Sequence, residues 1–151
     1  IYSDGGRSNY FKANLVGDCV CRAIANATGK DYKEVYDSLL RLEKTIKVGK
    51  HETRGTVRDG VRRSVAKHYI EKELGWKHHS TVIRGQGVTV HLTKEELPSG
   101  NLIVDISRHY TCVKDGVIVD TYNCSIKEYY DDFGQLVVND RRAVYNYWTK
   151  D

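Results

Sequence analysis

Residues 109–122 read His-Tyr-Thr-Cys-Val-Lys-Asp-Gly-Val-Ile-Val-Asp-Thr-Tyr, with β-forming residues on both sides of an Asp-Gly pair. An Asp-Gly pair between two such runs is a strong signal for a two-residue β-hairpin turn. With Asp115 and Gly116 as the turn, Lys114 is predicted to pair with Val117. This hairpin sets the register of the sheet that we predict for the second half of the chain.

The same register predicts that two chemically active side chains share one face of the hairpin. Thr111 falls opposite Asp120, and His109 lies two places further along the first strand, within diagonal reach of that carboxylate. An aspartate held against a histidine fixes the tautomer of the ring and stabilises an imidazolium. Taken singly, a strand histidine is more often a surface or core residue than a base. Asp120 alone is also consistent with an exposed strand end.

Outward from the hairpin, hydrophobic periodicity divides the chain into a helical first half and a strand-rich second half. This order predicts an α+β fold, with N-terminal helices packed on a C-terminal antiparallel β-sheet in a single domain, residues 1–151. The predicted helices are 19–28, 32–42, 56–74, a turn at 93–97 and 125–132; the predicted strands are 81–83, 88–90, 101–107, 109–113, 117–122, 136–138 and 143–148.

Composition and charge indicate a globular protein and do not favour a membrane or nucleic-acid partner. The chain has 151 residues, of which 40% are hydrophobic and 29% charged, as in ordinary globular proteins. No apolar run approaches the roughly 20 residues of a membrane span, so no membrane partner is expected. The net charge of +4 is mild and no basic stripe is evident, so nucleic-acid binding is not favoured. The first residues carry no secretion signal, which predicts a cytoplasmic location.

The four cysteines do not have the spacing of a zinc site. Cys19 and Cys21 are closer than a Cys-x2-4-Cys pair, while Cys112 and Cys124 each stand alone. We therefore expect no metal and no cofactor. Cys21, Cys112 and Cys124 are predicted to pack in a reduced protein, because free cysteines usually behave as small buried residues.

Cys19 lies where the first helix is predicted to begin. With Asp18 as N-cap, the thiol falls in the first helical turn, where unpaired N–H groups and the helix dipole favour an anion. Such a position lowers a thiol pKa, although the Asp18 carboxylate opposes the shift, so a cationic partner is needed. The competing interpretation is that Cys19 is only a small packing residue. Arg22, one turn later, is a candidate for binding a substrate carboxylate, although a solvated or salt-bridged arginine is the favoured expectation.

Two motifs together resemble a known superfamily. The segments G-D-C-x-x-R-A-I-A at 17–25 and H-Y-T-C-V-K-D-G-V-I-V-D-T at 109–121 look like those of papain-like cysteine peptidases. The similarity is greatest to small bacterial and phage relatives of the peptidases that process bacteriocin leaders. It covers most of the chain in the order of elements, but only these two motifs residue by residue. A phage protein of this kind would act in the host cytoplasm or the virion.

The resemblance implies a role for each site residue. Cys19 would be the nucleophile, His109 the base and then the acid, and Asp120 the residue that orients His109. The superfamily usually has a glutamine about six residues before the nucleophile, whereas this chain has Ala13 there and Asn14 one position later. Asn14 is therefore the candidate second donor of an oxyanion hole.

The sequence thus predicts a thiol hydrolase that cleaves a peptide or related amide bond through an acyl-enzyme. Transfer to an amine instead of water would use the same residues. Asn123 is a second candidate for the orienting role, and the basic segment 45–55 is a candidate rim for acidic substrates. The alternatives are a catalytically silent binding or inhibitor module on the same fold, and a basic nucleic-acid-associated protein. The oligomeric state is not predicted.

Overall fold

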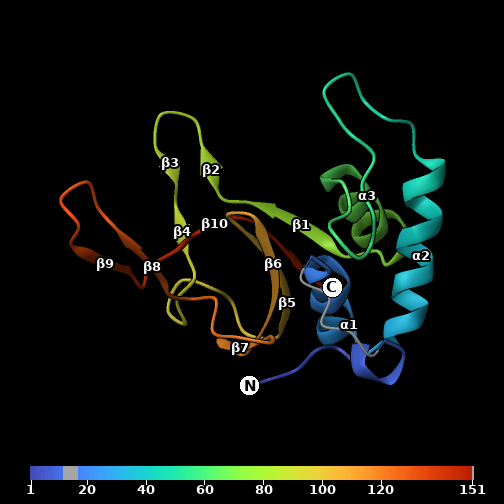
Figure 1. The fold of residues 1–151 in the computed structure, drawn as a ribbon, viewed down its shortest axis with the longest axis horizontal. Coiled ribbons are helices and arrows are strands. Elements are labelled where there is room, and N and C mark those ends of the chain that lie inside the picture. Colours follow the sequence, from blue (N-terminus) through green and yellow to red (C-terminus); the bar gives the residue numbers. More distant parts are fainter. Residues whose placement is uncertain (12–16, 151) are drawn as a thin grey trace.

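The computed structural model describes residues 1–11 and 17–150 and has an α+β architecture. Figure 1 shows the helices gathered on one side of a curved antiparallel sheet, with two hairpins extending from its other end. The helical elements come from the first half of the chain and the sheet from the second, as predicted. Among the described residues, no helix has the length and apolar character required to cross a bilayer.

The first two helices begin where the sequence predicted. Helix α1 (Cys19–Thr28) stops at Gly29, whose φ of 72° lies in the left-handed region that terminates helices. Helix α2 (Tyr32–Thr45) begins at Asp31, whose carboxylate accepts the N–H of Glu34 at 3.4 Å. The capping of α2 is therefore confirmed, and the helix runs three residues beyond its predicted end.

The predicted third helix at 56–74 is wrong in its first half. Thr56 and Gly60 form an isolated antiparallel bridge, so this stretch turns back on itself before any helix begins. Helix α3 (Arg63–His68) starts only after that turn and continues into a π-helical segment, η2 (Tyr69–Glu73). The apolar periodicity in the sequence carried no signal of the turn, because the backbone pairing at Gly60 does not depend on side-chain hydrophobicity.

The main sheet is antiparallel throughout, with strand order β1-β10-β5-β6-β7 and with β4 also paired to β10. Strand β10, the last in sequence, lies between β1 and β5. Strand β1 is therefore joined to the rest of the sheet only through this C-terminal segment. The strands are β1 (Lys77–Ser80), β4 (Val90–His91), β5 (Asn101–Ile106), β6 (His109–Lys114), β7 (Val117–Val119) and β10 (Ala143–Thr149).

Two further hairpins project from this sheet in Figure 1. One pairs β2 (Val82–Ile83) with β3 (Gly87–Val88), and the strand predicted at 88–90 is divided between β3 and β4. The other pairs β8 (Lys127–Tyr130) with β9 (Leu136–Asn139), so the helix predicted at 125–132 is wrong. The carboxylate of Asp131 accepts the N–H groups of Phe133 and Gln135, both at 2.9 Å, and this side-chain turn favours a hairpin over a helix.

The core occupies both faces of the sheet, because successive side chains on β5 and β6 point in opposite directions. One face packs against α1, which in turn contacts α2, and includes Ile103 and Cys112, both fully buried. The opposite face includes Val104 and Val113, which pack in a second cluster with Cys124. The predicted burial of Cys21, Cys112 and Cys124 is confirmed.

One basic side chain expected to face solvent is buried instead. Arg62, predicted on the outward face of the third helix with Arg58, Arg63 and Lys67, has a side chain only 4% exposed. Its Nε donates to Glu43 at 2.7 Å, and its Nη2 donates to the Ile46 carbonyl at 2.9 Å. This cluster fastens the segment before α3 to the C-terminal end of α2.

Candidate active site

The hairpin of β6 and β7 positions the first two site residues. Lys114 pairs with Val117, as predicted, and both residues of the Asp115-Gly116 turn have positive φ values, 49° and 80°. Positive φ at both positions is what a type I′ turn requires, and its twist matches that of the two strands. The predicted register is therefore confirmed for the paired residues next to the turn.

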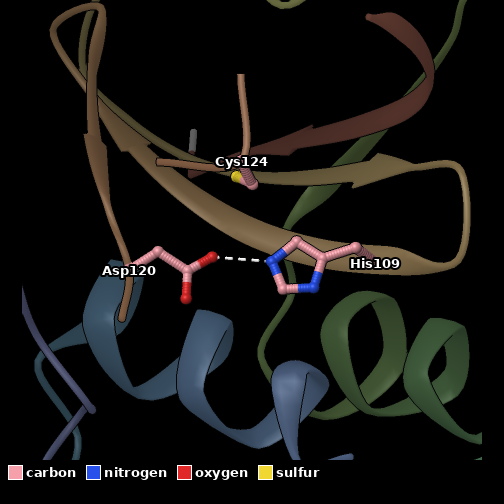
Figure 2. Close-up of side chains that lie close together, drawn as sticks. All are labelled: His109, Asp120 and Cys124. Carbon is pink, nitrogen blue, oxygen red and sulfur yellow. Dashed lines mark hydrogen bonds and ion pairs between the residues drawn. The ribbon is translucent and has the colours of Figure 1, made fainter. Parts of the chain in front are cut away.

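Asp120 contacts His109 directly. Nε2 of His109 lies 2.7 Å from Oδ2 of Asp120, and Figure 2 shows the ring edge turned toward that carboxylate. Thr111 donates to the same oxygen at 2.8 Å, while the N–H of Thr121 donates to the other oxygen at 2.7 Å. Both side chains of the pair are more than 90% buried. The carboxylate is held by several donors, and these hydrogen bonds lower the pKa of Asp120 although its burial raises it.

Cys19 is the first residue of α1, and the fold brings its sulfur to His109. Burial of the thiol favours its neutral form, but hydrogen bonds from His109 and from the Tyr110 backbone, with the charges of His109 and Arg22, lower the Cys19 pKa below its usual value. Cys19 is partly exposed, whereas the other three thiols are buried. The cysteine with a lowered pKa is therefore the one that can be reached from solvent.

The imidazole of His109 is strongly biased toward its charged form. Burial alone lowers its pKa, but hydrogen bonds with Asp120, Cys124 and Cys19 outweigh this and raise the pKa of His109 to about 12. A lowered thiol pKa beside a raised imidazole pKa favours a thiolate–imidazolium pair. The arrangement thus combines an activated nucleophile, a proton donor and an orienting carboxylate.

Asp18 does not cap α1 with its side chain, contrary to the prediction. The carboxylate is buried and binds Arg7 at 3.3 Å, the hydroxyl of Tyr32 at 2.6 Å, and Arg22 in a close ion pair. The repulsion that we expected between Asp18 and a Cys19 thiolate is thereby balanced by two guanidinium groups. Arg22 is salt-bridged, which was one of its two expected states, and is not solvated.

A cleft of about 660 Å³ opens beside Cys19 and His109. One wall comes from the turn at 56–60, whose backbone approaches the start of α1 so closely that a Cβ on Gly17 would meet the Asp59 carbonyl carbon at 2.5 Å. A glycine is therefore required two residues before Cys19. The described residues that line this cleft are Tyr2, Arg7, Gly17, Cys19, Val20, Arg22, Asp59, Gly60, Val61, Arg63, Arg108, His109, Tyr110, Thr121 and Tyr122.

Three further expectations from the sequence are not confirmed by the described residues. Asn14 lies outside the described residues, so its role as an oxyanion donor stays a prediction. Asn123 is not placed against His109; its side-chain oxygen accepts the N–H and hydroxyl of Ser125 in a turn. The segment 45–55 contributes no residue to the described lining of the cleft, which does not support its suggested role as a substrate rim.

Sequence reasoning missed one member of the site, Cys124. Its sulfur lies within 4.8 Å of the ligand atoms of His109 and Asp120, a donor set that could hold a metal ion. Figure 2 shows the three side chains together. The imidazole nitrogen nearest Asp120 already shares a proton with the carboxylate, and a metal would have to displace a proton held with a raised pKa. The hydrogen bond between His109 and Asp120 and a metal held by these three residues are therefore alternatives.

His109 contacts Asp120 directly, and it lines the same cleft as Cys19 and acts on the charge of that thiol. These are three of the four residues singled out from the sequence, the fourth being Asn14. Searches of protein-family models, curated proteins and solved structures find no match to this chain. The chemistry assigned to the site therefore depends on its own geometry and on the two short motifs.

Proposed function

We propose that the protein is a papain-like thiol hydrolase that cleaves a peptide or related amide bond. The observation that carries the proposal is the buried hydrogen bond between Asp120 and His109 beside Cys19, which begins α1 and lines the same cleft as His109. A nucleophile, a base within reach and a third group that orients the base form the recurring arrangement of acyl transfer. Superfamily membership is part of the proposal and is supported by the order of these residues along the chain.

The proposed reaction begins with the Cys19 thiolate. Its sulfur attacks the carbonyl carbon of the scissile amide, and the imidazolium of His109 donates its proton to the departing amine, which leaves a thioester on Cys19. His109, now neutral, takes a proton from water as the water attacks the thioester. The carboxylic acid product leaves, its proton is released to solvent, and the thiolate–imidazolium pair is restored. An amine in place of water would give transfer instead of hydrolysis.

Stabilisation of the oxyanion is assigned to the beginning of α1. The Asp18 side chain makes no cap bond there, so it does not compete for the first N–H groups of this ten-residue helix. The backbone N–H of Cys19 is the proposed first donor, and the dipole of the helix adds to it. The second donor is assigned to Asn14 on the sequence argument alone.

A peptide or protein is the proposed substrate, and the proposed location is a reducing compartment such as the cytoplasm. All four cysteines are free, including a partly exposed thiol with a lowered pKa that an oxidising environment would put at risk. We infer no membrane or nucleic-acid partner. Phage or bacterial origin remains a prediction from the resemblance.

The test uses the reactivity of the thiols and needs no substrate. At about pH 6, iodoacetamide should modify Cys19 much faster than the three buried cysteines, because only a thiolate reacts appreciably. His109→Ala should remove this preference, while His68→Ala, at an exposed histidine on α3, should keep it. Equal, slow labelling of all four cysteines in the folded protein would refute an activated nucleophile.

Activity is then measured with a mixture of peptides of varied sequence, followed by mass spectrometry of the products. We expect new cleavage fragments with the wild type and none with Cys19→Ala. A reactive Cys19 without cleavage or transfer of any peptide would instead favour the catalytically silent binding module.

A further inference from the structure

We propose that Arg22 is a positioning residue of this site, which joins the nucleophile helix to Asp120 and supplies the fixed positive charge beside Cys19. The inference builds on the proposed thiol hydrolase, because it assigns Arg22 a task in maintaining its triad. From the sequence, Arg22 was expected to be solvated or salt-bridged, or to bind a substrate carboxylate, and no role in holding the triad was predicted.

Arg22 bridges two buried carboxylates. It lies one helical turn after Asp18 on α1 and pairs with that residue through Nη1. Its Nη2 lies 3.6 Å from Oδ1 of Asp120, the carboxylate oxygen that does not bind His109. All three side chains are less than 10% exposed. Arg22 therefore contacts both the helix that begins with the nucleophile and the residue that orients the base.

Asp18, one of the two carboxylates that pair with Arg22, has two further contacts. Asp18 also binds Arg7 at 3.3 Å and accepts the hydroxyl of Tyr32 at 2.6 Å. These contacts fix Asp18, which in turn fixes the direction of the Arg22 guanidinium. A planar guanidinium can serve two carboxylates at once, whereas the single ammonium of lysine is a point charge. Asp120 is thereby constrained from its Oδ1 side while Oδ2 faces His109.

The charges of the cluster explain why this arginine matters to the thiol. Within the described network of Arg22 and its neighbours, with a thiolate and an imidazolium present, three cationic groups face three anionic groups. Replacing Arg22 by a neutral residue leaves one uncompensated negative charge in a buried site, and protonation of the sulfur relieves it. The balancing groups are Arg7, Arg22 and His109 against Asp18, Asp120 and Cys19.

Other groups that face the sulfur do not replace Arg22. Arg63 also acts on Cys19 from α3, but its guanidinium binds the buried carboxylate of Asp105 at 2.5 Å, and this pair stays in place when Arg22 is replaced. Tyr110, from β6, contributes its backbone to Cys19, and Asp59 adds a negative charge to the cleft wall. Arg22 is consequently the cation on α1 whose removal should be felt most directly by the thiolate.

The experiment is the pH dependence of iodoacetamide labelling at Cys19 in wild type, Arg22→Gln and Arg22→Lys. Cys19 and Arg22 are three residues apart on α1 and are therefore neighbours on the helix surface; a nearby opposite charge shifts a pKa by about one unit or more, so labelling of Arg22→Gln at about pH 6 should fall about tenfold. Arg22→Lys, which keeps the charge, should stay within about threefold of wild type. The matched control is Arg41→Gln on α2. It removes an exposed ion pair with Glu73 of η2 and should leave the labelling of Cys19 unchanged.

The outcomes separate this inference from the proposed function. A wild-type Cys19 with ordinary thiol reactivity would refute the activated nucleophile itself. A reactive wild type together with an unchanged pH profile in folded Arg22→Gln would overturn only the role of Arg22. If Arg22→Gln does not fold, Asp18→Asn replaces it. The asparagine keeps an oxygen that can accept from Arg22 and so retains the direction of the guanidinium, while removing the negative charge should leave labelling at about pH 6 as fast as in wild type or faster. Slower labelling in folded Asp18→Asn would contradict the charge balance.

Discussion

His109 and Asp120 are eleven positions apart in the chain, yet Nε2 of the ring lies 2.7 Å from the carboxylate. The β-turn at Asp115 and Gly116 makes this possible, because it folds β7 back along β6. With Nε2 engaged by Asp120, the proposed mechanism uses Nδ1 for proton transfer with Cys19. The predictions below follow from this contact and from the buried groups around it.

Replacing the carboxylate should abolish most of the activity while preserving the fold. Asp120→Asn keeps the size of the side chain but loses the charge that stabilises the imidazolium, and we expect kcat/KM to fall by about 10²- to 10⁴-fold. The measurement is cleavage of a peptide identified with the wild type, alongside circular dichroism. Asp37→Asn, at an exposed ion pair on α2, is the control and should be fully active. Full activity in Asp120→Asn would contradict the orienting role.

The pKa of His109 makes a prediction about stability at alkaline pH. The folded state holds a proton on His109 that the unfolded chain releases above about pH 6.5, so its stabilising contribution is complete below that value and declines as pH rises toward the raised pKa. In a Cys19→Ala background, where no thiol titrates at this site, the free energy of unfolding should therefore fall more steeply with pH for the parent than for His109→Gln. Urea denaturation at several pH values measures both slopes. Parallel slopes would show that His109 is not protonated preferentially in the folded state.

The buried pair of Glu43 and Arg62 should be essential for stability rather than for chemistry. Removing one partner leaves a buried charge uncompensated, so Glu43→Gln should lower the free energy of unfolding by about 3–5 kcal/mol. Lys33→Ala, which breaks an exposed pair with Asp37, should cost less than about 1 kcal/mol. Urea denaturation compares the two, and equal small losses would indicate that the buried pair contributes little.

Gly17 should tolerate no side chain. A Cβ there would lie 2.5 Å from the Asp59 backbone, so Gly17→Ala must displace the 56–60 turn or the start of α1. We expect slower labelling of Cys19 by iodoacetamide at about pH 6, because the thiolate depends on its precise surroundings. Gly134→Ala is the control: it introduces backbone strain at a φ of 74° in a turn remote from the cleft, and should leave labelling unchanged. Wild-type labelling in Gly17→Ala would contradict the tight approach.

An alkylating reagent should abolish the activity, whereas a chelator should leave it unchanged. Iodoacetamide should abolish hydrolysis by modifying Cys19, whereas EDTA should leave the rate unchanged, because the proposed chemistry uses only side chains of the protein. Cys124→Ala serves as the comparison, since it disrupts the donor set that could bind a metal but leaves the nucleophile in place. Loss of activity on chelation, restored by added zinc, would favour a metal centre at His109, Asp120 and Cys124.

Short-range signals in the sequence were sufficient for the elements that carry the site. The Asp-Gly turn set the register that brings His109 to Asp120, and Gly29 and Asp31 marked the junction between α1 and α2. These signals worked because each depends on backbone conformations or hydrogen bonds within a few residues of the position that encodes it. The α+β order followed in the same way from the change of hydrophobic period along the chain.

By itself, then, the sequence determined the helix at Cys19, the hairpin of His109 and the order of the elements. Only the tertiary structure decided that Asp18 binds Arg7 and Arg22 instead of capping its helix, that Arg62 is buried, and that Cys124 joins the site. The physical reason is that ion pairs and burial depend on which distant segments pack together. A carboxylate beside a helix start caps it when no stronger partner is near, but here the fold supplies two guanidinium groups.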